Sequence, residues 1–130
     1  MLEIISPITG ERLQVAENDL DKQMNWFSAK KICAKLGNGW RLPTISELEL
    51  MYKMLHKKGK GNFKNDIYWS NTGDSNVISS NECGLHFNFA TGSAKKMLEI
   101  KDYNYQLNNM SMKDCPYHVR LVRSYIYFLS

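Results

Sequence analysis

The stretch from Gly37 to Tyr52, GNGWRLPTISELELMY, constrains the fold more than any other part of the chain. Gly37 suits the left-handed backbone that commonly ends a helix, because glycine has no Cβ atom to clash there. Pro43 fixes its own φ and marks a turn. Thr44 and Glu47 have the spacing of a capping box, in which each side chain binds a backbone N–H of the other residue. The stretch therefore predicts the end of one helix, a rigid corner and the start of a second helix.

Apolar residues recur at helical spacing on both sides of this corner. The first helix should begin near Asn25, a residue type that is favoured at N-caps, and should end at Gly37. Its buried face is expected to comprise Trp26, Ala29, Ile32, Cys33 and Leu36. The buried face of the second helix is expected to comprise Leu48, Met51, Tyr52 and Leu55. Within the first set we expect Cys33 to act as a small buried apolar residue.

The corner itself carries a large and a charged side chain, Trp40 and Arg41. We expect Trp40 to be a packing anchor. We expect Arg41 to bind backbone carbonyls or a buried carboxylate such as that of Glu47 through its guanidinium fork. We therefore assign Trp40, Arg41, Thr44 and Glu47 to the scaffold. Ligand binding by Arg41, Arg120 or Arg123 is the alternative.

Beyond the second helix the apolar pattern changes to the period of a strand. Strands are expected at four places: Leu2–Ile5, Ile67–Ser70, Leu85–Phe89 and Tyr117–Leu129. Residues 11–23 and the basic stretch 56–65 are expected to be loops. The apolar end of the last strand is expected to pair with the N-terminal strand and so join the termini. This order of elements predicts an α+β domain.

Length and charge exclude several classes of protein. A chain of 130 residues forms one domain, residues 1–130, with a core of its own. The 17 basic and 13 acidic residues give a net charge of +4, weaker than the concentrated basic surface of a dedicated nucleic-acid binder. No apolar run approaches the roughly 20 residues that span a bilayer. The first residues lack the features of a signal peptide, which predicts the cytoplasm if the chain is complete and an extracytoplasmic place if a signal was removed.

The three cysteines, Cys33, Cys83 and Cys115, cannot all pair within one chain. We expect reduced thiols, and one bridge plus one thiol is the alternative. Two C-x-x-H pairs, Cys83 with His86 and Cys115 with His118, contain four ligand types that suit zinc. A structural or incidental role for these residues is the competing interpretation, and we assign no metal.

Five segments of the chain together resemble a known family. They are Asn25–Ala29, Gly39–Thr44 with Glu47 and Leu48, Tyr68–Ser70, Phe87–Gly92 and Val119–Arg123. In this order they are similar to a bacterial family of domains of unknown function with a C-type-lectin-like fold, found also at the ends of collagen-like adhesins. The resemblance covers residues 24–124 and rests on WRLPT followed later by VRLVR.

The resemblance implies two helices flanking a small twisted antiparallel sheet with paired termini. It does not imply one activity, because function in such a scaffold lies in its loops. The wider superfamily includes formylglycine-generating enzymes, which implies a cysteine enzyme using Cys83 or Cys115, with His86 or His118 as base, as an alternative. Many lectins of this fold bind sugar through calcium. The oxygen-rich residues here that would serve are Asn71, Asp74, Asn76 and Glu82, although such residues also form ordinary turns.

The best binding candidates by composition lie between residues 103 and 109. Tyrosine offers a large rigid contact area and asparagine offers adaptable hydrogen bonds, a mixture that recognition loops favour. We therefore expect a non-enzymatic, adhesin- or receptor-like module that binds a protein or glycan through the loops between residues 71 and 116. The expected contact residues are Tyr103, Asn104, Tyr105, Asn108 and Trp69. A third hypothesis is self-association through the apolar end Tyr125–Leu129.

Overall fold

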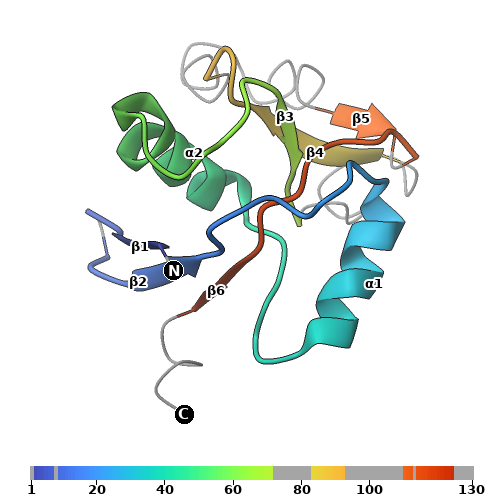
Figure 1. The fold of residues 1–130 in the computed structure, drawn as a ribbon, viewed down its shortest axis with the longest axis horizontal. Helices are drawn as coiled ribbons and strands as arrows, with labels where there is room; N and C mark the ends of the chain where they lie inside the picture. Colours follow the sequence, from blue (N-terminus) through green and yellow to red (C-terminus); the bar gives the residue numbers. More distant parts are fainter. Residues whose placement is uncertain (1, 8, 72–82, 93–109, 113, 125–130) are drawn as a thin grey trace.

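The computed structural model describes residues 2–7, 9–71, 83–92, 110–112 and 114–124, and its side-chain detail excludes 83–84 and 110–112 (Figure 1). It is a mixed α and β structure with two α-helices and small antiparallel sheets, so the α+β class is confirmed. The elements in chain order are β1 (Leu2–Ile5), β2 (Arg12–Val15), α1 (Trp26–Leu36), α2 (Ile45–Met54), a 3-10 turn (His56–Lys58), β3 (Ile67–Trp69), β4 (Cys83–Asn88), β5 (Met110–Met112) and β6 (Val122–Ser124).

The described strands form two three-stranded sheets, where the family resemblance implied one. The first sheet has the order β1-β2-β6 and the second has the order β3-β4-β5. In the first sheet Leu13 of β2 lies opposite Ser124 of β6, and Ile4 of β1 lies opposite Leu13 from the other side. Within the described residues the C-terminal strand β6 therefore pairs with β2. The apolar end that was predicted to pair with the N-terminal strand lies outside the described residues.

The segment 11–23 had been predicted to be a loop, and part of it is β2. Leu13 and Val15 of this strand are buried, and their alternation with Arg12 and Gln14 is the period of a strand. A reverse turn with Gly10 in a left-handed conformation joins β1 to β2. The hairpin supplies the central strand of the first sheet.

Residues 117–124 run through the centre of the molecule and bind neighbours on both sides. On one side the carbonyls of Val119 and Leu121 accept hydrogen bonds from the residue 16–24 segment. On the other side the carbonyl of His118 accepts a bond from the backbone N–H of Trp69, and Val122 exchanges two backbone bonds with Arg41. Among the described residues of this segment β6 begins at Val122, and Tyr117 and His118 form only isolated bridges, so the predicted strand Tyr117–Leu129 began too early. Residues 125–130 lie outside the described chain.

The two helices begin as the sequence predicted. The side chain of Asn25 caps α1 by accepting a bond from the N–H of Ser28, and the capping box of Thr44 and Glu47 begins α2. The predicted buried face of α1 is only partly correct. Ala29 and Cys33 are buried, whereas Leu36 is 49% exposed. Burial raises the pKa of the Cys33 thiol.

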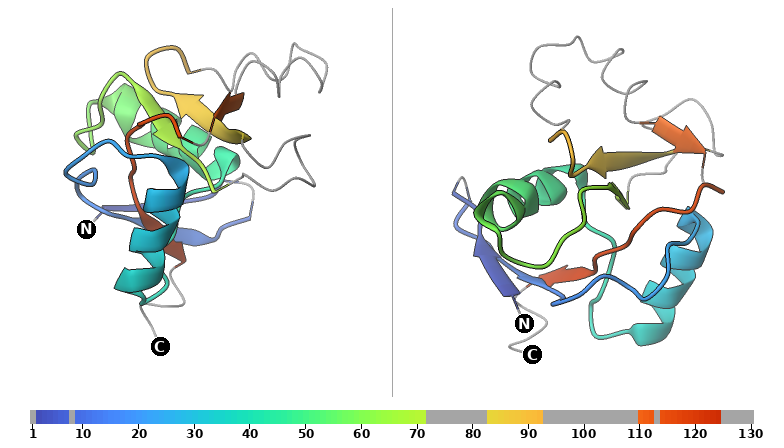
Figure 2. Two further views of the ribbon diagram at one scale, coloured as in Figure 1. Left: turned by 90° about the vertical axis from the view of Figure 1, so that its right-hand side faces the viewer. Right: turned by 45° about the horizontal axis from the view of Figure 1, so that its top comes forward.

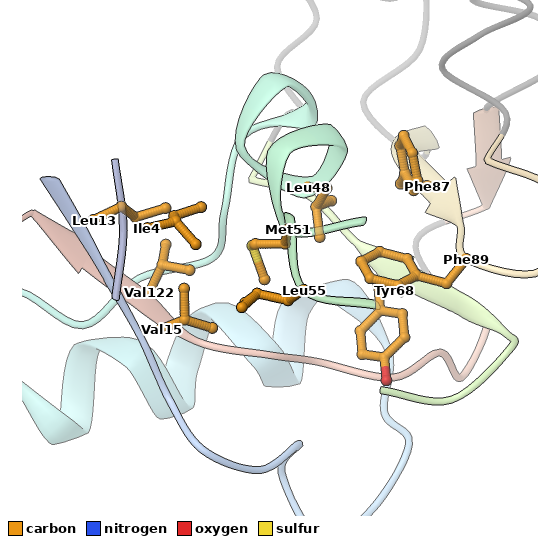
Figure 3. Close-up of a cluster of buried hydrophobic side chains, with 10 residues drawn as sticks. All are labelled: Ile4, Leu13, Val15, Leu48, Met51, Leu55, Tyr68, Phe87, Phe89 and Val122. Atoms are coloured by element: carbon orange, nitrogen blue, oxygen red, sulfur yellow. The ribbon is translucent and has the colours of Figure 1, made fainter. Parts of the chain in front are cut away.

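Helix α2 lies between the two sheets and forms the first core cluster with them. Figure 3 shows side chains of α2 between those of the first sheet and the aromatic side chains of the second. The buried members are Ile4, Leu13, Val15, Leu48, Met51, Leu55, Tyr68, Phe87, Phe89 and Val122. Gly92 lies against this cluster with φ +62°, and a Cβ atom there would meet the Tyr52 ring at 2.7 Å.

Helix α1 packs on the other side of the 117–124 segment and forms a second cluster (Figure 2). Its buried members are Ala29, Cys33, Leu42, Trp69, Val119 and Leu121. The C-terminal segment contributes to both clusters, and it therefore connects the two halves of the core.

Candidate functional site

The most unusual feature of the structure is a buried charged side chain, Arg120. Its Nε donates to Oδ1 of Asp19 at 2.8 Å. Its two terminal nitrogens donate to the carbonyls of Ala16 and Asn62, each at 3.2 Å. The guanidinium carbon also lies 3.9 Å from the centre of the Phe63 ring, within the range of a cation–π contact. The buried cation is thus paired and hydrogen-bonded, the condition under which burial of a charge is tolerated.

Tyr68 extends this network. Its hydroxyl donates to Oδ2 of Asp19 at 2.7 Å and accepts from the backbone N–H of Lys64 at 2.9 Å. Burial raises the pKa of Tyr68, and the carboxylate of Asp19 acts in the same direction. The hydroxyl therefore keeps its proton and remains a donor to Asp19.

His118 lies between two carboxylates at the edge of this network. Its Nε2 is 3.1 Å from Oδ2 of Asp66, and its Nδ1 is 3.8 Å from Oδ2 of Asp19. Its ring also packs against that of Tyr68, with the ring centres 5.3 Å apart. The imidazole is therefore held in one place by a ring on one side and carboxylates at both nitrogens.

A hollow of about 270 Å³ opens beside His118. Asn18–Asp21 and Gln23 line one part of it, and Asn62 and Lys64 line another. Asp19 and His118 belong both to the network and to the wall of the hollow. A fixed polar network thus lies under a small polar surface depression.

A larger hollow of about 530 Å³ lies between the β1–β2 hairpin and the start of α2. The charged side chains on its α2 side, Arg41 and Glu47, are bound to each other through two bonds of 2.7 and 2.8 Å. Apolar side chains such as Leu13 and Leu50 supply much of the remaining lining. Its chemistry is therefore less specific than that of the smaller hollow.

The corner residues have the scaffold roles that the sequence predicted for them. Burial raises the pKa of Glu47, but the hydrogen bonds from Arg41 and from the backbone N–H of Thr44 outweigh this effect and lower it. Trp40 is partly exposed and packs against the second cluster, and the guanidinium of Arg123 lies 4.5 Å from the centre of its ring. The Arg123 Nε also donates to the side chain of Gln14 at 2.7 Å.

Trp69 had been predicted to contact a ligand, and the structure corrects this. The side chain is fully buried in the second cluster. Its indole N–H donates to the carbonyl of Met24 at 3.0 Å, and its ring packs against Tyr117. Trp69 is a core residue with no exposed face for a ligand.

The other predicted contact residues, Tyr103, Asn104, Tyr105 and Asn108, lie outside the described residues. The structure does describe the two strands that the connection 89–109 joins. In the β4–β5 pair Cys83 lies opposite Met112 and Leu85 lies opposite Met110. The two ends of the connection are therefore held at the same sheet.

The structure does not bring the zinc set together. His86 is opposite Trp69 in the β3–β4 pair and packs against Tyr117. His118 instead packs against Tyr68, the neighbour of Trp69, whose side chain is on the other face of the sheet. One ion cannot bind two imidazoles on opposite faces. Within the described part of the chain no group of three or more metal-ligating side chains is found.

The remaining cysteines and oxygen ligands can be placed only in part. Cys115 is a half-buried thiol without a disulfide and packs against the second cluster. The backbone N–H of Asn71 donates to the carbonyl of Pro43 at 2.8 Å. Asp74, Asn76 and Glu82, the other residues of the calcium hypothesis, lie outside the described residues. The side chain of Cys83 is not described either.

Sequence patterns did not identify the buried network. Asp19 lay in a presumed loop, and Tyr68 was recognised only as part of a strand. Arg120 was considered as a ligand-binding residue, whereas its side chain is enclosed by protein groups. The one signal available was the position of Arg120 inside an apolar strand-like stretch. A charged residue in such a place indicates a buried hydrogen-bond or ion-pair partner but does not identify it.

Comparison with known proteins finds no matching family model and no matching curated protein. No helix within the described ranges has the length and apolar character needed to cross a membrane.

Proposed function

We propose that this chain is a non-enzymatic recognition module with a C-type-lectin-like fold. It binds a protein or a glycan through the loops between residues 71 and 116, chiefly through the connection between β4 and β5. The expected contact residues are Tyr103, Asn104, Tyr105 and Asn108. Trp69 no longer belongs to this set because it is buried.

The pairing of β4 with β5 is the observation that carries the proposal. Leu85 lies opposite Met110, so the chain that leaves β4 returns to the same sheet. A loop with both ends on one sheet loses less conformational freedom on binding than a free tail does. The scaffold under it is tied to the rest of the domain by the buried Tyr68 and Phe87.

The composition of the connection gives independent support. Two tyrosines and three asparagines occur between residues 103 and 109. Tyrosine buries a large area with only two side-chain torsions, and asparagine amides adapt as donor or acceptor. These are properties of a binding surface, and they do not require a nucleophile or a metal.

The test is the double substitution Tyr103→Ala with Tyr105→Ala. Wild-type and variant proteins are applied to arrays of glycans and of purified proteins, and bound partners are then titrated. We expect the variant to lose binding while its melting temperature stays within about 4 °C of wild type, which corresponds to less than about 1 kcal/mol. Phe27→Ala is the matched control, because Phe27 is a half-exposed aromatic residue on α1, far along the chain from the connection. Equal binding by wild type and the double variant would refute this site.

A further inference from the structure

The hollow beside His118 has the properties of a binding site that is separate from the β4–β5 connection. Its floor is fixed before any ligand arrives. Asp19 is held by Arg120 and Tyr68, and His118 is held between Asp19 and Asp66. A floor whose groups are already ordered costs little conformational entropy when a ligand binds.

One wall of the hollow is held as firmly as the floor. Asn62 has a left-handed backbone with φ 56°, and its carbonyl accepts a bond from Arg120. The backbone N–H of Lys64 is bound by the Tyr68 hydroxyl. The opposite wall, the segment 18–23, is fixed by the bond from the N–H of Leu20 to the carbonyl of Val119. Backbone groups in both parts of the lining are therefore hydrogen-bonded to the rest of the fold without a ligand.

The charges of the acidic and basic side chains that line the hollow cancel once Arg120 is counted with Asp19, and the further carboxylate at its edge, that of Asp66, lies against His118. Asp19 is paired with Arg120 at the floor. At the walls one carboxylate, that of Asp21, is balanced by one ammonium, that of Lys64. A site without a net charge does not select anions or cations by long-range attraction.

The wall side chains offer hydrogen-bond donors and acceptors side by side. Asn18, Gln23 and Asn62 each carry an amide that has both, Asp21 adds acceptors and Lys64 adds a donor. Within the described part of the chain these five side chains make no hydrogen bond to protein. A hydroxyl group is itself both donor and acceptor, so a neighbouring pair of hydroxyls matches such a wall.

We propose that this hollow binds a small uncharged molecule with several hydroxyl groups, such as a single sugar ring. The volume of about 270 Å³ lies just below the range of roughly 300–1,000 Å³ that holds drug-sized ligands, so the ligand is smaller than those. The site does not depend on the β4–β5 connection or on the function proposed for it.

The test uses the full chain and four neutral probes: glucose, galactose, mannose and N-acetylglucosamine. Each is titrated into ¹⁵N-labelled protein, and amide shifts are followed by NMR. We expect at least one sugar to shift the signals of residues 18–23, 62–64 and 118, with an affinity on the order of 1 mM. Shifts confined to other regions, or no shifts with all four sugars, would overturn the proposal.

Two variants test whether the sugar binds in this hollow. Asn18→Ala combined with Asp21→Ala removes two exposed wall side chains that make no hydrogen bond or ion pair in the described chain, and should weaken binding by about tenfold or more. Lys22→Ala is the matched control, because Lys22 is exposed in the same segment and does not line the hollow. It should bind as wild type does, and so should the variant with alanine at Tyr103 and Tyr105. Unchanged binding in the Asn18 and Asp21 variant would contradict the assignment.

Charged probes test the ligand class. Glucose 6-phosphate and glucosamine carry the same ring with a negative and a positive charge. We expect neither to bind more tightly than the best neutral sugar, because the charges of the hollow cancel. A tenfold preference for either charged sugar over the neutral sugars would show that the hollow selects a charged ligand, and it would refute the proposal.

Discussion

The Nε atom of Arg120 donates a hydrogen bond to Oδ1 of Asp19 at 2.8 Å, although the two residues are 101 positions apart. The Arg120 side chain is fully buried and that of Asp19 is 11% exposed. Removal of one member of a buried ion pair leaves the other charge without compensation, which costs far more than loss of a surface pair.

Asp19→Ala should therefore lower the free energy of unfolding by about 3–5 kcal/mol. The substitution removes the partner of Arg120 and also the acceptor of the Tyr68 hydroxyl. Urea denaturation followed by tryptophan fluorescence measures the change. Glu3→Ala is the control, because it breaks only the exposed pair of Glu3 with Arg12 and should change stability by less than about 0.5 kcal/mol. Equal effects of the two substitutions on the free energy of unfolding would show that the buried pair does not stabilise the fold.

The capping box at the start of α2 gives a second prediction. Thr44→Ala removes the acceptor of the Glu47 backbone N–H and should cost about 1 kcal/mol of stability. Thr44→Ser keeps the hydroxyl and should retain most of that stability. The two variants are compared by chemical denaturation under the same conditions. Indistinguishable midpoints would mean that the hydroxyl does not stabilise the helix.

His86 gives a third prediction, about pH. Burial lowers the pKa of His86 to about 4, below its value of about 6.5 in an unfolded chain. Between these values the unfolded state binds more protons than the folded state does, so stability rises with pH in this window. It should fall by about 2 kcal/mol as the pH is lowered from 7 to 4.5 through this group alone.

His86→Gln should lose that part of the pH dependence, while contributions from the carboxylates remain. Denaturation at pH 7 and pH 4.5 gives the comparison. The titration of the His86 ring protons, followed by NMR in the folded protein, is a direct check. A titration midpoint of His86 near pH 6.5 would show that burial does not lower its pKa, and would contradict the prediction.

Local signals in the sequence predicted the parts of the fold that depend on neighbouring residues. Asn25, Thr44 and Glu47 marked the helix starts correctly, because caps are made within one turn of the chain. The strand β2 was missed although Leu13 and Val15 alternate with polar residues, since four residues give only a short period-two pattern. Whether this segment forms a strand depends on β1 and β6, which pair with it on either side.

The site could be predicted less well than the fold, because its contacts span the chain. Asp19, Tyr68 and Arg120 come from three separate segments, and no short pattern connects them. Trp69 was misjudged for a related reason. An aromatic residue at the end of a short strand has the same local sequence whether it faces solvent or, as here, the α1 side of the core.

The central position of residues 117–124 has a consequence for the order of events during protein synthesis. This segment binds the carbonyl and amide groups of residues near 16, 24, 41 and 69, and it joins both core clusters. Until it leaves the ribosome, β2 lacks its β6 neighbour, Asp19 lacks its cation and α1 lacks part of the surface against which it packs. Folding of this domain is therefore postponed until residues 117–124 have been synthesised, and until then the earlier segments keep apolar side chains exposed.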